Sequence, residues 1–130
     1  MDLVLNRTYT DGSDGLEIIT RLPDKHYLYK YDFREEPDRQ REDGTTEKCY
    51  SYVPVLLKGY PNLNEVIKYL LRQVISLENE LKMINDLNEV KMLNEGNINE
   101  TPEYEAYTRY LEFRHEIKHK VRDDFNNAKL

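Results

Sequence analysis

The segment Leu56–Ser76, LLKGYPNLNEVIKYLLRQVIS, separates two halves of the chain that have different residue patterns. Gly59 accepts a positive φ, and Pro61 has no amide hydrogen to donate to a strand ladder, so the extended run before them should end here. Asn62 is then a suitable helix N-cap. In residues 63–75, large aliphatic side chains recur at the i, i+3, i+4 and i+7 spacing, which predicts a buried amphipathic helix.

Residues 1–58, before this helix, form a tyrosine-rich region in which we expect a small antiparallel sheet. Short runs with strand character are separated by the turn signals Asp11–Gly15 and Pro23-Asp24. The expected strands cover residues 3–9, 16–22, 26–33 and 49–57. In the third of these, alternation places four aromatic residues on one face, and these are Tyr27, Tyr29, Tyr31 and Phe33.

The fourth strand and the segment before it carry two further expectations. Pro54 cannot donate to a ladder, so this strand should lie at a sheet edge or contain a bulge, and Tyr50 and Tyr52 should share a face. Residues 34–48 contain no apolar side chain and mix both signs of charge. We expect a solvated loop there, at the tip of a long hairpin, with a docking loop that orders on a partner as the alternative.

Residues 59–130 read as helical throughout, with helices expected over 63–75, 77–93 and 102–127. Ser76 suits a second N-cap, although a bend at Ser76 in a continuous helix is the alternative, and Thr101-Pro102 open the last helix in the favoured order. The apolar spacing of the last two helices predicts an antiparallel hairpin. The fold class is therefore α+β: a small antiparallel sheet followed by three helices, of which the first covers the sheet.

Composition excludes several classes of protein. The net charge is −6, and each half carries −3, with 9 basic and 12 acidic residues in 1–60 and 10 and 13 in 61–130, so nucleic acid is not an expected partner. The single Cys49 allows neither an internal disulfide nor a cysteine-based metal cluster. No run approaches the ~20 apolar residues of a membrane span, so no membrane partner is expected. We expect no cofactor, because no phosphate-binding glycine loop or nucleophile motif occurs.

His115-Glu116-Ile117-Lys118-His119 matches the H-E-x-x-H pattern on an expected helix. Two histidines four residues apart share a helical face and can bind one zinc ion, with the glutamate as general base. No third ligand follows within the motif's own helix, because only eleven residues follow His119, none is histidine, and Asp123 and Asp124 lie on the same helix. A third ligand such as His26 would have to come from the strand half. A solvated charged face is the preferred interpretation, and a zinc-dependent hydrolase is kept as the alternative function.

The C-terminal part resembles small proteins encoded among the structural genes of tailed phages and prophages of Bacteroides-type gut bacteria. The residues that carry the resemblance are Gly59-Tyr60-Pro61, Glu65-Val66-Ile67, Leu70-Leu71-Arg72, Ser76–Leu81, Pro102-Glu103-Tyr104, Tyr107, Tyr110, Phe113 and Lys118. The resemblance implies a capsid-, fibre- or tail-associated virion protein, located in the virion and in the host cytoplasm during assembly. It implies function through protein contacts, without enzymatic activity.

The leading functional hypothesis is therefore a non-enzymatic virion structural or assembly protein, whose partners are other virion proteins and further copies of itself. A regulatory module that binds a host protein through residues 34–48 or the helical hairpin is a further alternative. The aromatic excess suggests the contact residues. These are Tyr27, Tyr29, Tyr31, Tyr50, Tyr52, Tyr104, Tyr107, Tyr110 and Phe113.

Overall fold

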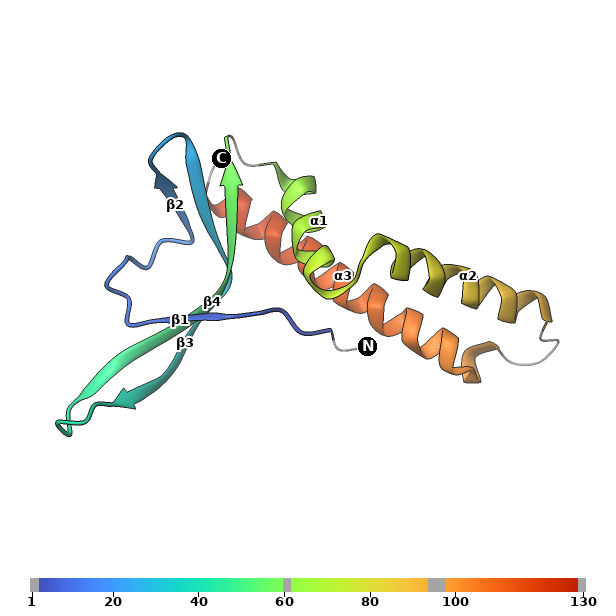
Figure 1. The fold of residues 1–130 in the computed structure, drawn as a ribbon, viewed down its shortest axis with the longest axis horizontal. Helices are drawn as coiled ribbons and strands as arrows, with labels where there is room; N and C mark the ends of the chain where they lie inside the picture. Colours follow the sequence, from blue (N-terminus) through green and yellow to red (C-terminus); the bar gives the residue numbers. More distant parts are fainter. Residues whose placement is uncertain (1–2, 60–61, 94–97, 129–130) are drawn as a thin grey trace.

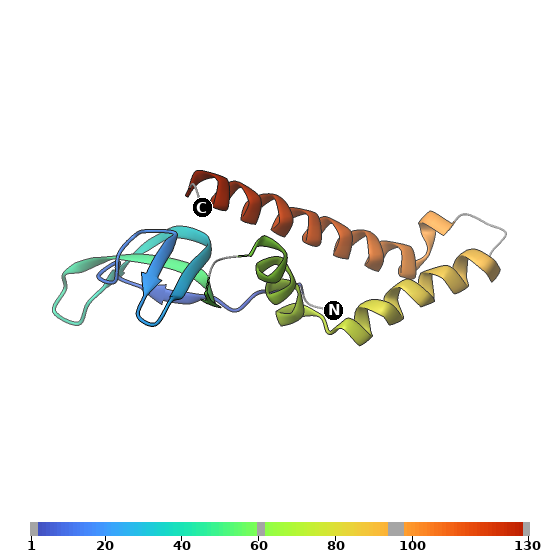
Figure 2. The same ribbon diagram turned by 90° about the horizontal axis from the view of Figure 1, so that it is seen from above.

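The protein is an elongated α+β molecule with a four-stranded antiparallel sheet at one end and a helical hairpin at the other (Figures 1 and 2). The structure, a computed structural model, describes residues 3–59, 62–93 and 98–128. The strands are β1 (Thr8–Thr10), β2 (Ile19–Leu22), β3 (His26–Gln40) and β4 (Thr46–Lys58), in the sheet order β1-β4-β3-β2. The helices are α1 (Leu63–Val74), α2 (Leu77–Leu93), the short 3₁₀ helix η1 (Ile98–Glu100) and α3 (Pro102–Asn127). The expected fold class is thus confirmed.

The long hairpin of β3 and β4 replaces most of the loop expected over residues 34–48. The strands continue to Gln40 and resume at Thr46, so only a short turn at residues 41–45 separates them. Ion pairs between Arg41 and Glu47 (2.8 Å) and between Lys48 and Glu35 (3.0 Å) join the two strands near this turn. The polar composition conceals the strands because ladder hydrogen bonds need only backbone groups.

β1 is much shorter than the strand expected over residues 3–9, and Pro54 explains why. The Lys30 amide donates to the Ile18 carbonyl (2.8 Å), so it points away from β4. In an antiparallel ladder, the backbone groups of two directly opposed residues point either toward each other or away from each other. The amide of Lys30 points away from β4, so the backbone nitrogen of its partner Pro54 points away from β3 and toward the β1 side. Pro54 has no hydrogen to donate there, and the β1 ladder stops at the Thr8–Tyr52 pair. The expectation of an edge at Pro54 therefore holds for this part of β4.

A bulge at Asp32 changes which face Phe33 occupies. Asp32 has a φ of 53°, and the β3–β4 register shifts between Tyr31 and Arg34. Phe33 consequently stacks on Tyr50 and Tyr52, with centroid distances of 5.5 and 6.2 Å, on the face opposite the core. The prediction that Phe33 shares the face of Tyr29 and Tyr31 is wrong, since one inserted residue inverts the alternation.

The core lies between one sheet face, α1 and the C-terminal half of α3. Tyr29 on β3 contacts Phe125 on α3 edge to face at 5.3 Å, and its hydroxyl donates to Asp124. Val53, Val55 and Leu57 of β4 complete the sheet side of this core. The expectation that α1 covers the sheet is thus incomplete, because α3, which begins in the hairpin, ends over the sheet as well (Figure 2).

The outer face of the sheet is covered by the connection between β1 and β2. Lys30 is only 1% exposed, and its ammonium donates to the Gly15 carbonyl (2.8 Å). The same ammonium lies 5.3 Å from the ring centroid of Tyr52 and 5.9 Å from that of Phe33. Cation–π contacts and one hydrogen bond therefore hold a buried amine, and they hold the connection against the sheet.

The helix boundaries lie close to the expected ones. The Asn62 side chain caps α1 by accepting from the amides of Asn64 (3.0 Å) and Glu65 (3.3 Å). Ile75 is extended, and Ser76 caps α2 through the Asn79 amide (3.1 Å), so the two helices are separate and not one bent helix. The expected Tyr60-Pro61 turn and the expected connector around Gly96 lie outside the described residues. No described helix is long and apolar enough to cross a membrane.

Candidate functional site: the helical hairpin

α2 and the N-terminal half of α3 run antiparallel and extend away from the sheet (Figures 1 and 2). Each begins at a hydroxyl cap, and Thr101 accepts from the Tyr104 amide at 3.3 Å. α3 belongs to both ends of the molecule, whereas α2 packs mainly on α3. The hairpin therefore offers α2 to solvent on most of its circumference.

α2 buries very little of its apolar surface. Of its seventeen residues only Glu80 and Leu87 are buried, and Leu77 and Leu81 remain 55% and 51% exposed. Leu77 and Leu81 are four residues apart, so they lie on one side of the helix. Met92 and Leu93 at its far end are also largely exposed. The stripe that the sequence indicates is present as a helix face, but in the described part of the chain it lacks a partner for the two leucines.

A groove of about 440 Å³ lies on the opposite flank of α2, between this helix and the start of α3. Ile75 and Met83 contribute apolar surface from one side, and Pro102 and Ala106 from the other. Lys82 and Asp86 stand at its rim. Both flanks of α2 thus combine apolar surface with a few charges, which is the composition of protein contact surfaces.

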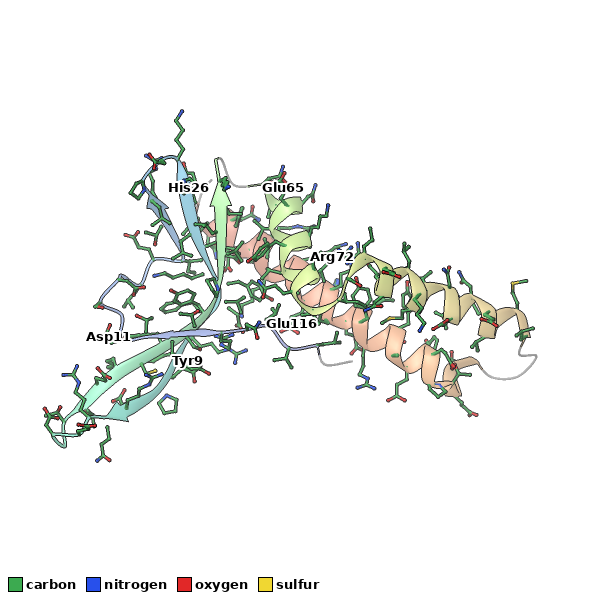
Figure 3. The ribbon with its side chains drawn as sticks, viewed as in Figure 1. Tyr9, Asp11, His26, Glu65, Arg72 and Glu116 are labelled. Carbon is green, nitrogen blue, oxygen red and sulfur yellow. The ribbon has the colours of Figure 1, made fainter. Side chains whose placement is uncertain are left out.

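A buried carboxylate fastens α2 to the other two helices. Glu80 accepts from the Tyr110 hydroxyl and pairs with Arg72 at 2.7 Å and Arg114 at 3.6 Å. Figure 3 shows Arg72 where α1 turns into α2. A glutamate in the first turn of a helix is ordinarily explained as a favourable charge for the helix dipole. The position of Glu80 seven residues before Leu87, on the same face, is the signal that indicates burial.

The electrostatics of Glu80 follow from these contacts. Burial opposes ionisation of Glu80, but the Tyr110 hydrogen bond and the Arg72 guanidinium outweigh it and lower the pKa of the carboxyl below its usual value. Burial and the hydrogen bond to Glu80 raise the pKa of Tyr110 to about 12. The carboxylate is therefore charged and the phenol neutral at physiological pH.

A second charged cluster joins the N-terminal segment, the sheet and α3. The Asp32 carboxylate forms ion pairs with Arg7 at 2.9 Å, with Arg34 at 2.5 Å and with Lys120. Arg7 also donates a hydrogen bond to the Ser51 hydroxyl. Burial would raise the pKa of Asp32, but the hydrogen bonds from Lys120 and Arg34 outweigh it and set the pKa at about 2. Because Asp32 is the bulged residue, the cluster fixes the backbone where the sheet changes register.

The aromatic residues predicted as contacts have two different positions. Tyr29, Tyr31, Tyr52 and Tyr110 are buried within the chain, at 0%, 4%, 5% and 1% exposure. Their prediction as contact residues is corrected, since the sheet, the helices and the outer connection already cover their rings. The other five are half-buried and stay candidates: Tyr27, Tyr50, Tyr104, Tyr107 and Phe113.

The H-E-x-x-H residues lie on the exposed surface of α3. The His115 and His119 rings contact each other with centroids 4.3 Å apart. Glu116 lies on another flank, where α3 passes the N-terminal segment beside Leu5 and Arg7 (Figure 3). Within residues 3–59, 62–93 and 98–128, no three histidine, cysteine or carboxylate side chains are grouped so that they could hold a metal ion.

Comparisons with known proteins add no relative: no family model matches the chain, and neither a curated protein nor a solved structure matches it.

Proposed function

We propose that this protein is a non-enzymatic assembly protein that associates with a second copy of itself through α2. The observation that carries the proposal is the exposure of Leu77 and Leu81, together with the small number of buried residues on α2. Exposed leucine pairs on a helix with so little internal packing are typical of surfaces that another chain covers. Fully burying each leucine contributes ~1.5–3 kcal/mol, so four leucines across a symmetric contact supply substantial stabilisation.

The leucine pair itself favours a second copy as the occupant. Leu77 and Leu81 lie on one side of α2, and both are exposed. In a two-fold antiparallel contact, equivalent faces meet, so the leucine pair of one chain packs on the leucine pair of the other. The surface is therefore complementary to itself in its apolar pattern.

The test is the oligomeric state of the purified protein by native mass spectrometry and light scattering. We expect a defined dimer or larger oligomer, and we expect the double variant Leu77→Lys/Leu81→Lys to be monomeric at the same concentration. The matched control is Leu16→Lys/Leu56→Lys, because these sheet-side leucines are 53% and 57% exposed. A wild-type protein that remains monomeric contradicts the proposal. So does an oligomer that dissociates in the control and not in the α2 variant.

The finer proposal is that this assembly belongs to a tailed-phage virion, as the resemblance of the C-terminal part implies. The contact surface on α2 lies within that part of the chain. Mass spectrometry of purified phage particles from a strain carrying the gene should find the protein at a fixed ratio to the major structural proteins. Its absence from particles, while it accumulates in the cell lysate, would contradict the virion assignment and leave self-association to be judged separately.

A further inference from the structure

A hollow of about 270 Å³ lies where α1, the start of α2 and the middle of α3 meet. Lys68 and Arg72 of α1 line it from one side, and Arg114 and Lys118 of α3 from the other. Its remaining lining comes from the Asn64 side chain, the apolar Ile67 and Leu71, and Glu80. A second hollow lies next to it along α3. It shares Arg114 and Lys118 with the first and is also lined by His115 and Glu112.

The charges in the hollow are unbalanced. Four cationic side chains surround the single carboxylate of Glu80, which gives a local excess of three positive charges in a chain whose net charge is −6. Both Glu80 oxygens are already in use, since Oε1 accepts from Tyr110 and lies 3.6 Å from Arg114, and Oε2 lies 2.7 Å from Arg72. Lys68 and Lys118 therefore have no share in this carboxylate.

The two guanidinium groups are also incompletely paired. The Nε atoms of Arg72 and Arg114 are buried, and neither has a hydrogen-bond partner within the described chain. Buried donors without a partner destabilise the folded state. The chain thus satisfies these two guanidinium groups only in part, through Glu80 for both and through the Ile75 carbonyl for Arg72 (3.5 Å).

The Asp32 cluster shows the contrast. There Arg7, Arg34 and Lys120 all contact one carboxylate, and Arg7 donates further to the Ser51 hydroxyl and the Asp32 carbonyl. Those cations are engaged by groups of the chain itself. The hollow beside Glu80 differs because its lysines are available and its arginines are held in place by Glu80.

We propose that this hollow binds a phosphate monoester dianion, with Arg72 and Arg114 as fixed donors and Lys68 and Lys118 as closing cations. Arginine presents planar paired donors that match phosphate oxygens, and lysine adds a point charge. A doubly charged oxyanion neutralises more of the excess of three positive charges than a singly charged carboxylate does. The volume corresponds to about nine water molecules at ~30 Å³ each, which admits a phosphate with a small attached group.

The same dianion can come from a phosphorylated small molecule or from a phosphorylated side chain. Titrations with inorganic phosphate, phosphoserine and acetate, followed by NMR chemical shifts at constant ionic strength, separate these cases. We expect phosphate and phosphoserine to shift the α1 and α3 amides around the hollow, with affinity at least about 10-fold above that for acetate. Tighter binding of phosphoserine indicates a side-chain source, and equal or tighter binding of inorganic phosphate indicates a small molecule.

The informative variants are Lys68→Gln and Lys118→Gln, because neither lysine contacts Glu80 and both variants should fold. Each should weaken phosphate binding about 10-fold, and the pair should abolish it in the measured range. The matched control is Lys91→Gln at the exposed far end of α2, which should leave binding unchanged. Equal affinity for acetate, or equal loss in the Lys91 control, overturns the proposal. These titrations do not depend on oligomeric state, so they test the hollow separately from self-association.

Discussion

At the scale of single residues, Asp32 links the backbone geometry of the sheet to a cluster of charges. Its positive φ creates the bulge, and its carboxylate collects cations from the N-terminal segment, β3 and α3. Aspartate tolerates this left-handed conformation better than most residues do. Strand patterning assumes strict alternation, so the sequence placed Phe33 on the wrong face and offered no sign of the cluster.

Replacing Asp32 with asparagine should remove the charge and keep the backbone conformation, which asparagine also tolerates. We expect the free energy of unfolding at pH 7 to fall by about 1–3 kcal/mol, the usual contribution of hydrogen bonds to a charged group. The folded pKa of about 2 lies below the ordinary 3.8, so this stabilisation is complete above about pH 4 and is lost as the pH falls through 2. Urea unfolding at pH 7 and pH 2 should therefore show a difference between wild type and variant that shrinks in acid.

The control for this experiment is Asp38→Asn, an exposed aspartate of the same strand. It should change the unfolding free energy little at either pH. A difference for Asp32→Asn that is the same at pH 7 and pH 2 would show that the carboxylate charge is not what stabilises the cluster.

At the scale of elements, the helices were predictable and the strands only partly so. Caps and apolar spacing are local signals, and α1, α2 and α3 begin at the residues those signals indicate. Strand length depends on the neighbouring strand. Pro54 indicated an edge in its own strand but not that β1 would end beside it, and the polar ladder beyond Arg34 cannot be read from one strand alone. For the hairpin, the apolar spacing predicts a helical stripe of Leu77, Leu81, Ile84 and Leu87. It does not show that only Leu87 of these is buried.

The cap of α1 can be tested directly. Asn62→Ala removes the acceptor for two amides of the first turn, and we expect it to lower the unfolding free energy by about 1 kcal/mol. Asn62→Asp keeps an acceptor and places a negative charge at the helix N-terminus, so its stability should stay close to that of wild type. Equilibrium denaturation followed by circular dichroism measures both, and an equal loss in both variants would contradict the role of the cap.

At the scale of the whole molecule, α3 connects the two ends. Phe125 near its end packs on Tyr29 of the sheet, and Tyr110 in its first half binds Glu80 of the hairpin. An α-helix of this length rises about 1.5 Å per residue, so one rigid element spans from the sheet to the hairpin. Loss of either end removes packing from the same helix, which couples the stability of both.

We therefore expect one cooperative unfolding transition. In the monomeric Leu77→Lys/Leu81→Lys variant, far-UV circular dichroism reports mainly the helices, and near-UV circular dichroism reports the packed tyrosines. The two midpoints in urea should coincide, as two-state unfolding requires. A helical signal that is lost at lower urea than the tyrosine signal would show that the hairpin unfolds independently of the sheet.

The enclosed amine of Lys30 makes the chain's lysines chemically unequal. Its ammonium lies beneath the β1–β2 connection and the residue is 1% exposed, whereas Lys58, Lys82 and Lys91 are open to solvent. An amine-acylating reagent should modify those three within its normal reaction time and leave Lys30 unmodified, as peptide mass spectrometry would record. Lys30 should become labelled only when the connection separates from the sheet, so its labelling rate reports how often that separation occurs. Labelling of Lys30 at the rate of Lys58 would show that the connection does not stay closed in solution.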